Sequence, residues 1–512
     1  MINVNQTLSD FLIKNFEANL VKSISDKQID GVTIKHLCFD SREVKEGDAF
    51  VVLPSVAGNE QEYVDKATAQ GCKLIITQQA FENVTVPAVL VADVMDWAGQ
   101  FLKRYHQKKT QALNVMGITG TNGKSSISFY LAQLLNELER VNNPEKNNSG
   151  INKQACAVMG TLGYGPWDQL KATGMTTLPL EKLHAALSEL SENFAHVAIE
   201  VSSHGLEQKR LSGVEFSLAV FSNLSRDHLD YHGTMAAYGA EKAKLFQWPT
   251  LQNVVINIDD AYGAQLAGNL QHVSCISYGK DSNATLRFTL DDIDNAGLVI
   301  SFYYQGQQAQ TNVPLYGEFN AYNSAAALAC ALTMGFEFEQ AVAALHVLIP
   351  VEGRMMQVQL KGDVPLVLVD YAHTPDALEQ VLKSVQSHCQ GEIHLVVGCG
   401  GDRDQGKRPL MAKIAVQFAD KVVFTSDNPR SESPEKILQD MTQELSAEFV
   451  QEVDRKTAIE LAVLQADAND LVIIAGKGHE DYQEISGQRL YFSDKAVALE
   501  ALQHKLQLEK TL

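Results

Sequence analysis

One segment restricts the possible folds of this chain more than any other: between residues 113 and 135, an apolar strand, a glycine loop and a helix follow one another. LNVMGIT predicts a buried strand, and ISFYLAQLL predicts an amphipathic helix. Glycines in the intervening GTNGKSS let backbone N–H groups converge on phosphate oxygens, and the start of the helix adds positive potential. The loop departs from the strict G-x(4)-G-K-[ST] pattern by one residue, because Gly117 lies six positions before Gly123. The flanking strand and helix still predict a nucleoside triphosphate site.

The polar residues of this loop have predicted roles. Lys124 can reach the β and γ phosphates, and the Ser125 hydroxyl can bind Mg²⁺. The predicted ATP-binding residues of the loop are Gly120, Thr121, Asn122, Gly123, Lys124, Ser125 and Ser126.

Length and charge narrow the class of protein. A chain of 512 residues predicts about three domains. Its 42 Lys and Arg against 62 Asp and Glu give a net charge of −20, which argues against nucleic acid or an anionic membrane as the main partner. Its apolar runs are far shorter than the ~20 residues of a membrane span. Seven cysteines without a C-x-x-C pair favour a reduced cytoplasmic protein with neither a disulfide framework nor a zinc site.

Alternating strand and helix patterns predict an α/β fold in three domains. Residues 1–110 form a small α/β domain, residues 111–348 a central phosphate-loop ATPase domain with a mostly parallel sheet, and residues 349–512 a Rossmann-like domain. In the last domain, VPLVLVDYA, EIHLVVGCGG, KVVFTSD and DLVIIAGKG alternate with helical segments, which is typical of a parallel sheet with crossover helices.

A second group of polar residues follows apolar strands of the central domain. EVSSH begins at Glu200, and SNLSRDHLDYH contains His228. Because ligands gather at the carboxyl ends of parallel strands, these side chains suit a hard-metal site, although histidine is an unusual ligand for Mg²⁺. A single such residue is more often merely hydrogen-bonded or solvated. By pattern alone, Lys242 is a surface lysine on a helix.

Two further segments have alternative interpretations. Asn257, Asp259 and Asp260 could bind a ribose or a base, or could form an Asx turn. The amides of Asn320 and Asn323 could read a base edge, or could simply lie at the start of a helix.

Four polar strand ends in the last domain predict a shared crevice, since the carboxyl ends of parallel strands meet at one edge. They are DYAHTPD, GCGGDRD, DNPR and GKGHE. Arg403 and Arg430 could clamp a carboxylate, while Asp427 and Glu480 could hold an ammonium group. This combination indicates a pocket for a zwitterionic amino acid.

The motifs taken together resemble the Mur ligase family, and within it the members that add the third residue of the peptidoglycan stem peptide. They are GITGTNGKS, EVSSHGL, SNLSRDHLDYHG, YGAEKAKLF, YGEFNAYNSAAAL, VEGRM, VDYAHTPDAL, GCGGDRDQGKRP, DNPRSESP and GKGHEDYQ, and they extend over the whole chain. The resemblance implies an ATP-driven amide ligation in cytoplasmic peptidoglycan precursor synthesis. In that reaction a substrate carboxylate forms an acyl phosphate, which an amine then attacks.

The resemblance also implies a role for each matching residue. Lys124, Glu200, His228 and Lys242 would be catalytic, with Ser125, Glu200, His228 and a carbamylated Lys242 as Mg²⁺ ligands. Asn320, Arg354 and Asp370 would complete the ATP site. Contacts to the uridine nucleotide and its muramoyl dipeptide would come from Ser41, Arg42, Thr176, Thr177, Ser202, Gln208 and Arg210. The incoming amino acid would contact Arg403, Asp427, Asn428, Pro429, Arg430, Gly476 and Glu480.

The residue after DNP implies the amino acid that is added. Arg430 resembles the type that adds meso-diaminopimelate to UDP-N-acetylmuramoyl-L-alanyl-D-glutamate, because its guanidinium can pair with a distal carboxylate that L-lysine lacks. Alternatives are the same reaction with L-lysine, a folylpolyglutamate synthase, a phosphate-loop kinase or switch ATPase, and an inactive binding module. We expect a monomer that acts on small molecules and does not insert into a membrane.

Overall fold

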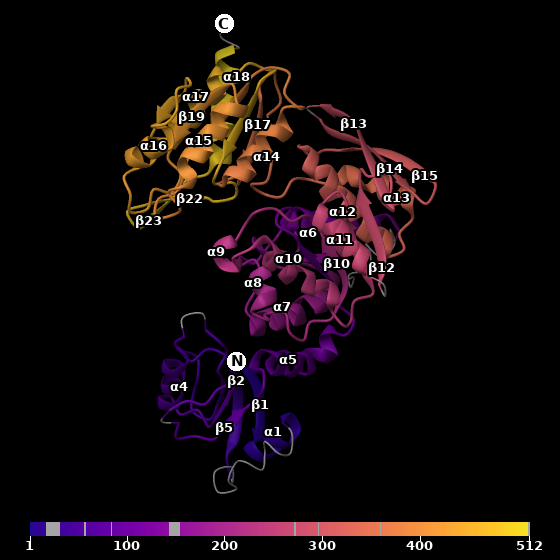
Figure 1. The fold of residues 1–512 in the computed structure, drawn as a ribbon, viewed down its shortest axis with the longest axis vertical. Coiled ribbons are helices and arrows are strands. Elements are labelled where there is room, and N and C mark those ends of the chain that lie inside the picture. Colours follow the sequence, from indigo (N-terminus) through magenta and orange to yellow (C-terminus); the bar gives the residue numbers. More distant parts are fainter. Residues whose placement is uncertain are drawn as a thin grey trace. The chain divides into compact units, whose positions relative to one another are not determined.

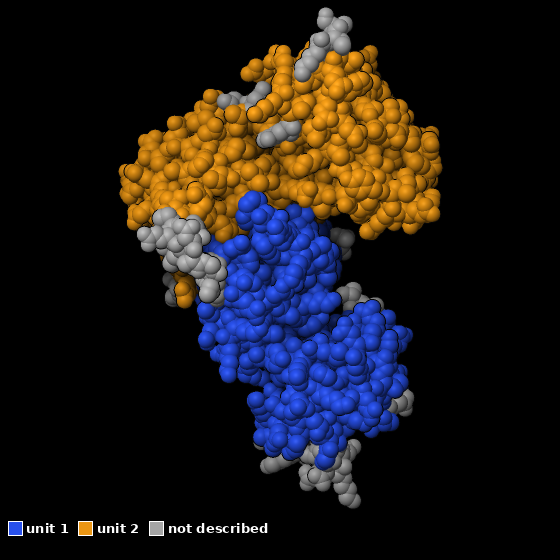
Figure 2. Space-filling model, turned by 180° about the vertical axis from the view of Figure 1, so that it is seen from behind, with its two compact units in different colours: residues 1–119, 151–217, 228–251 blue, residues 120–150, 218–227, 252–512 orange. Residues whose placement is uncertain are grey.

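The computed structural model describes residues 1–16, 31–55, 58–82, 84–142, 154–270, 273–294, 296–358 and 360–509. These residues divide into two compact units, drawn in different colours in Figure 2. Unit 1 comprises residues 1–119, 151–217 and 228–251, and unit 2 comprises residues 120–150, 218–227 and 252–512. Each unit is therefore assembled from segments that are distant in the sequence.

The N-terminal part of unit 1 is a sheet with helices on both faces (Figure 1). Its strands lie in the order β1 (Ile2–Thr7), β2 (Thr33–Cys38), β3 (Ala49–Val51), β4 (Leu74–Thr77) and β5 (Ala88–Leu90), with only the β1–β2 pair antiparallel among these described strands. Successive side chains of β4 alternate between two apolar cores. One core includes α1 (Leu8–Asn15) and α5 (Val94–Thr110), and the other includes α4 (Glu60–Ala69).

The rest of unit 1 holds the strand that ends at Glu200. β9 (Phe194–Glu200) is paired in parallel with β6 (Asn114–Thr119) on one side and β7 (Gln154–Gly160) on the other, and β8 (Gly163–Gly165) forms a hairpin with β7. The accompanying helices are α7 (Leu180–Asn193), α8 (Ser203–Glu207), α9 (Leu229–His232), α10 (Met235–Ala243) and the 3₁₀ turn η2 (Lys244–Gln247).

Unit 2 begins at Gly120 in the glycine loop and continues with the helix α6 (Lys124–Asn142). The strand β10 (Phe216–Phe221), in unit 2 from Leu218 onward, pairs in parallel with β11 (Asn253–Asn257), and the pairing continues to β12 (Ser274–Gly279) and β13 (Leu286–Asp294). β14 (Gly297–Tyr304) and β15 (Gln307–Val313) complete an antiparallel meander that the sequence did not predict. α11 (Ala261–Asn269), α12 (Glu318–Thr333), α13 (Phe338–Ala344) and η3 (Leu345–Val347) belong to the same part.

The C-terminal part of unit 2 is built on a mostly parallel sheet, as predicted. The strand order is β16 (Met356–Gln357), β17 (Leu366–Asp370), β21 (Leu471–Ala475), β18 (Ile393–Val397), β19 (Lys421–Thr425) and β20 (Val450–Glu452), with β16 antiparallel to β17. The last parallel strand, β21, thus lies between the first two. A separate hairpin, β22 (Tyr482–Ile485) with β23 (Gln488–Tyr491), follows it.

Helices cover both faces of this sheet (Figure 1). α14 (Pro375–Val385), α15 (Lys407–Phe418) and α16 (Pro434–Thr442) contribute to one core, and α17 (Arg455–Gln465) and α18 (Asp494–Glu509) contribute to the other. The four inner strands β17, β18, β19 and β21 are buried on both faces, which explains their continuous apolar sequences. This topology brings the ends of β17, β18, β19 and β21 to one edge.

The α/β class expected from the sequence is confirmed. The exact boundaries after residues 110 and 348 stay a prediction. Within the described ranges, the structure contains no helix whose length and apolarity would let it span a membrane.

Candidate active site

The glycine loop has a backbone conformation that requires its glycines. Gly120 and Gly123 have φ angles of +150° and +86°. A methyl group at Gly120 would lie 1.9 Å from Ser222 Oγ, and one at Gly123 would lie 2.6 Å from Asn323 Oδ1. α6 begins at Lys124, so the unpaired N–H groups of a helix start directly follow the loop. The predicted strand, loop and helix are confirmed, and the local backbone suits a phosphate.

A second segment of unit 2 braces this loop. The Thr121 and Asn122 N–H groups donate to Asn223 O and Oδ1 at 2.8 and 3.0 Å, and the Ser225 N–H donates to Thr121 Oγ1 at 3.0 Å. Ser222 Oγ donates to Asn122 O at 2.6 Å. The SNLS segment therefore fixes the loop, a role that the sequence did not indicate.

The ammonium group of Lys124 lies on its own loop. Its Nζ donates to Gly120 O at 2.9 Å and to Thr121 O at 2.7 Å. Ser126, in the first turn of α6, is buried. The structure thus places a positive charge directly beside the backbone that would surround a phosphate.

Asn320 is a buried hydrogen-bonding centre. Its Oδ1 accepts from Tyr130 OH at 3.1 Å and from Asn323 Nδ2 at 3.0 Å, and its Nδ2 donates to Tyr316 O at 2.8 Å. These contacts already use most of the amide, so they favour a structural role at the start of α12. The adenine contact stays a prediction.

The Asx-turn interpretation fits the acidic pair after β11. Asp260 caps α11 by accepting from the Tyr262 and Gly263 N–H groups at 3.0 and 2.9 Å. Asp259 accepts from the Lys280 N–H at 2.7 Å and from Tyr322 OH at 2.8 Å.

Glu200 ends β9 with its side chain almost completely buried. Its Oε1 accepts from the Thr161 N–H and its Oε2 from Thr161 Oγ1, both at 3.0 Å. A methyl group at Gly160 would lie 2.1 Å from Glu200 Oε1, so the carboxylate needs that glycine. Only 1% of Glu200 is exposed, and a buried carboxylate is costly without donors or a cation.

The residues predicted to bind the muramoyl dipeptide lie together next to Glu200 in unit 1. Thr176 Oγ1 is 3.1 Å from Thr161 Oγ1, and Thr177 Oγ1 donates to Glu200 O at 3.1 Å. The others form a chain from Thr177: Ser202 Oγ lies 3.0 Å from Thr177 Oγ1, Arg210 Nη1 donates to Thr177 O at 3.0 Å, and Arg210 Nη2 donates to Gln208 Oε1 at 2.6 Å. The sequence motif therefore identified a connected set.

Lys242 is buried, contrary to what its pattern alone suggested. It is 1% exposed on α10, and its Nζ lies 4.3 Å from the centre of the Tyr238 ring. His228 has a left-handed backbone (φ 52°) and its ring is 5.0 Å from that of His204. His232 stacks on Tyr238 at 5.1 Å, and burial lowers the pKa of His232. Burial among aromatic and imidazole rings sets Lys242 apart from a surface lysine.

The predicted uridine contacts lie after β2. Ser41 is buried, whereas the side chain of Arg42 is exposed and donates from Nε and Nη2 to Asp40 at 2.9 and 2.6 Å. These hydrogen bonds lower the pKa of Asp40 to about 2.

Arg354 and Asp370 lie close to each other in unit 2. The buried Asp370 carboxylate accepts from the Met355 N–H at 2.8 Å and from the Ala372 N–H at 2.7 Å. The Arg354 guanidinium lies 4.7 Å from the centre of the Tyr371 ring. Burial raises the pKa of Asp370, and the nearby charge of Arg354 opposes that shift.

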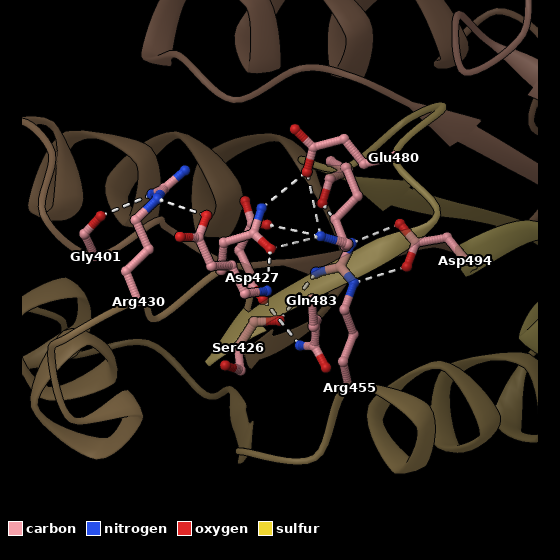
Figure 3. A network of polar contacts seen from close by, with 12 residues as sticks. Gly401, Ser426, Asp427, Arg430, Arg455, Glu480, Gln483 and Asp494 are labelled. Carbon is pink, nitrogen blue, oxygen red and sulfur yellow. Dashed lines mark hydrogen bonds and ion pairs between the residues drawn. The ribbon is translucent and has the colours of Figure 1, made fainter. Parts of the chain in front are cut away.

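The predicted amino-acid pocket is a network of charges at the ends of β18, β19 and β21 (Figure 3). Asn428 Nδ2 donates to Glu480 Oε2 at 2.8 Å. A methyl group at Gly476, where φ is +116°, would lie 3.2 Å from Asp427 Oδ2. A methyl group at Gly401 would lie 2.0 Å from Pro429 O, which shows how closely the two loops pack. These contacts bring three of the four strand ends together, and the crevice that all four would share stays a prediction.

Arg430 is held by both its backbone and its side chain. Its backbone is left-handed (φ 51°), and its N–H donates to Glu484 O at 2.9 Å. The guanidinium donates from Nη1 to Gly401 O at 2.8 Å and lies 3.5 Å, from Nε, from Glu484 Oε2 (Figure 3). A methyl group at Gly400 would be 3.0 Å from Arg430 Nη1 and 3.8 Å from Cγ of Arg403, which is exposed. Both predicted arginines therefore flank Gly400.

A buried ion pair that the sequence analysis missed supports this pocket. Arg455 and Asp494 have fully buried side chains, and Arg455 Nε and Nη2 each donate to Asp494 at 2.7 Å (Figure 3). Arg455 also donates to Ala475 O at 3.0 Å and to Ser426 O at 3.3 Å, the residues immediately before Gly476 and Asp427. Arg455 begins α17 and Asp494 begins α18, so no local sequence pattern could have indicated that they pair.

Comparison with known proteins identifies the family. Two family models match the chain: the Mur ligase middle domain at residues 118–331, and the Mur ligase, glutamate ligase domain at residues 353–478. A curated protein of Vibrio cholerae serotype O1 is 39% identical over 94% of this chain and 96% of its own length. The chain belongs to the Mur ligase family. The resemblance drawn from the motifs is thereby confirmed.

Two relatives and one solved structure carry the same protein name. The Vibrio cholerae protein and a Neisseria meningitidis serogroup B protein, 40% identical over 90% of this chain and 94% of its own, are both named UDP-N-acetylmuramoyl-L-alanyl-D-glutamate--2,6-diaminopimelate ligase. A solved structure of a ligase of that name is 37% identical, has a TM-score of 0.70, and covers 94% of this chain and 97% of its own. The likeness to this Mur ligase therefore extends over nearly the full chain.

Proposed function

We propose that this Mur ligase joins meso-diaminopimelate to the D-glutamate carboxyl group of UDP-N-acetylmuramoyl-L-alanyl-D-glutamate, converting ATP to ADP and phosphate. The observation that carries the proposal is the pocket at the ends of β18, β19 and β21. There the carboxylates of Asp427 and Glu480 and the guanidinium of Arg430 offer complementary charges to an amino acid. Full-length relatives named for this reaction support it.

The reaction has two steps. The substrate carboxylate attacks the γ-phosphorus of ATP to give an acyl phosphate, and ADP leaves. The neutral amine then attacks the acyl carbon, phosphate leaves, and the new amide nitrogen loses a proton. Positioning and electrostatic stabilisation supply most of the catalysis in such phosphoryl transfers.

The chain's own residues have assigned roles in these steps. The glycine loop binds the triphosphate through its backbone N–H groups, and Lys124 neutralises charge at the γ-phosphate. Arg354, Asp370 and Asn320 are assigned to the rest of ATP. Ser41 and Arg42 are assigned to the uridine nucleotide. The dipeptide that carries the reacting carboxyl group is assigned to the residues beside Glu200, which are Thr176, Thr177, Ser202, Gln208 and Arg210.

The donor chemistry suits Mg²⁺. Glu200 offers a buried carboxylate, which is the kind of oxygen ligand that Mg²⁺ prefers. We assign Ser125 and Glu200 to one ion, and His228 with a carbamylated Lys242 to a second. Bound Mg²⁺ would add charge neutralisation at the phosphates.

The burial of Lys242 supports its carbamylation. The side chain is almost fully buried and lies against the Tyr238 ring, which is the setting of a lysine that serves a site and not of a solvated surface lysine. Lys242→Ala should lose activity and regain part of it when a short carboxylic acid is supplied at high bicarbonate. An absence of rescue, with a folded variant, would argue against the carbamate.

Arg430 is assigned to the distal carboxylate of diaminopimelate. With L-lysine the guanidinium would lack that partner and would face a cationic end instead, a mismatch that costs a few kcal/mol, or ~10²-fold in selectivity. Arg430→Ala should therefore raise the KM for diaminopimelate sharply and spare that for ATP. The control is Arg489→Ala. Arg489 lies in the β22–β23 hairpin, to which the Arg430 backbone bonds, and its guanidinium stacks on Tyr482, 4.3 Å from the ring centre.

The first experiment measures phosphate release from ATP in the presence of the nucleotide dipeptide. No amine, L-lysine and meso-diaminopimelate are compared, and the tripeptide product is identified by mass. Release that needs both the dipeptide and diaminopimelate supports the proposal. Release with lysine would retain the reaction but overturn the specificity, and amine-independent release would favour a kinase or switch ATPase. Action in the cytoplasm and a monomeric state stay predictions from the sequence.

A further inference from the structure

A lysine with no assigned role lies at the centre of the amine pocket. Lys477 follows β21, and none of its side chain is exposed. Its Nζ donates to Asn428 Oδ1 at 3.1 Å and to Glu480 Oε2 at 3.3 Å, and it lies 3.5 Å from Asp427 Oδ1. The ammonium group therefore contacts the acceptors that the proposed function assigns to the substrate.

The contacts of Lys477 fix the direction in which those acceptors face. Asn428 Oδ1 also accepts the Glu484 N–H at 2.9 Å, while Asn428 Nδ2 donates to the same Glu480 oxygen that Lys477 contacts. Figure 3 shows the other oxygen of Glu480 pointing away from this network. Lys477 and Asn428 thus hold one Glu480 oxygen and leave the second for a ligand.

The charges of this cluster also depend on Lys477. Asp427 and Glu480 bring two negative charges into a largely buried space, and Lys477 supplies one positive charge. Asp427 Oδ1 forms a 3.5 Å ion pair with Lys477 Nζ but accepts no hydrogen bond from any described residue. One net negative charge then remains on the two carboxylates, which matches a single ammonium group.

We propose that Lys477 is a positioning residue for the incoming amine: it holds Asp427, Asn428 and Glu480 in place and neutralises one carboxylate, so that the pocket accepts one ammonium group. This inference rests on the proposed function. The pair Arg455–Asp494 shows the alternative of a buried cation matched to a carboxylate with no assigned ligand role. The three partners of Lys477, by contrast, all belong to the predicted pocket.

The test is Lys477→Met, which keeps an unbranched chain as far as Cε and removes the ammonium group. The KM for diaminopimelate should rise at least tenfold, since the two carboxylates repel each other and Glu480 loses its orientation. The KM values for ATP and for the nucleotide dipeptide should stay within about twofold, a split that general loss of structure would not produce. The matched control is Lys505→Met, which removes a buried ammonium group bonded to Leu464 O at 3.1 Å.

A double-mutant cycle tests whether the effect acts through Glu480. Glu480→Gln alone and Lys477→Met alone should each raise the amine KM, and the double variant should be no worse than the poorer single one. Simple multiplication of the two effects would contradict a shared action. Lys477→Gln, which keeps an N–H donor without the charge, is a second variant if Lys477→Met does not fold.

The possible failures can be separated. If the parent enzyme shows no amine-dependent phosphate release, the proposed function fails before any variant is made. If the parent is active and a folded Lys477→Met or Lys477→Gln retains the parental amine KM, the positioning role is wrong. If neither variant folds, Lys477 serves the fold and the proposal is overturned as well.

Discussion

The glycine loop and the predicted amino-acid pocket of unit 2 are built in different ways. The loop is shaped by backbone: Gly120 and Gly123 adopt positive φ angles, and the Ser222–Ser225 segment bonds to its main chain. The pocket is shaped by buried charged side chains from four separate stretches, with Arg455 and Lys477 at its centre. A site formed by the backbone is disturbed by an added methyl group. A network of charged side chains is disturbed when a single charged group is removed.

The largest expected effect is on activity, and it comes from replacing Lys124 in the glycine loop. Lys124→Met should reduce phosphate release ~10³-fold, because the charge at the γ-phosphate is lost. The free energy of unfolding should change little, since the lysine donates to carbonyls of its own half-buried loop. Activity is measured under saturating substrates and stability by urea denaturation. A variant that is as active as the parent would remove Lys124 from the mechanism.

The pocket should show the opposite behaviour. Arg455→Met leaves Asp494 as an uncompensated charge in a fully buried position, which costs about 3–5 kcal/mol of unfolding free energy. Urea denaturation of the whole chain measures this loss. The double variant Arg455→Met/Asp494→Leu removes both charges and should recover most of the stability. If the single variant is as stable as the parent, the pocket does not depend on this ion pair and the comparison fails.

The same contrast explains what the sequence could predict. The strand, loop and helix around Lys124 were predicted because a local pattern encodes them, and the proximity of the strand ends in the last domain followed from parallel topology. The supporting roles of Arg455, Asp494 and Lys477 were not predicted. Arg455 pairs with Asp494 and Lys477 bonds to Asn428, and these partners are distant in the sequence. The sequence around a buried lysine also does not distinguish it from an exposed one. The β13–β15 meander and the insertion of β21 between β17 and β18 also depend on long-range pairing. The pattern around Lys242 predicted a surface residue, and only the family motif implied a role for it.

Adding a methyl group at Gly123 tests whether the glycine loop depends on its backbone conformation and close packing. Gly123→Ala places Cβ 2.6 Å from Asn323 Oδ1 and also strains a residue at φ +86°, so the KM for ATP should rise roughly tenfold. Gly335→Ala is the matched control, because Gly335 has the same φ of +86° with nothing within 4 Å of an added Cβ. Equal ATP KM values in the two variants would show that close packing in the loop is unimportant.

The smallest effect concerns a charge at the rim of the pocket. Glu484 lies 3.5 Å from Arg430 Nε, and about a quarter of its side chain is exposed, so their attraction is partly screened by water. In Glu484→Gln the guanidinium no longer has a competing carboxylate, and the KM for diaminopimelate should fall about two- to fivefold. The KM for L-lysine, whose distal end is cationic, should rise, because Arg430 would then repel it more strongly. Steady-state kinetics with both amines measure the ratio. If both KM values move in the same direction, Glu484 acts through the backbone of its hairpin rather than through its charge.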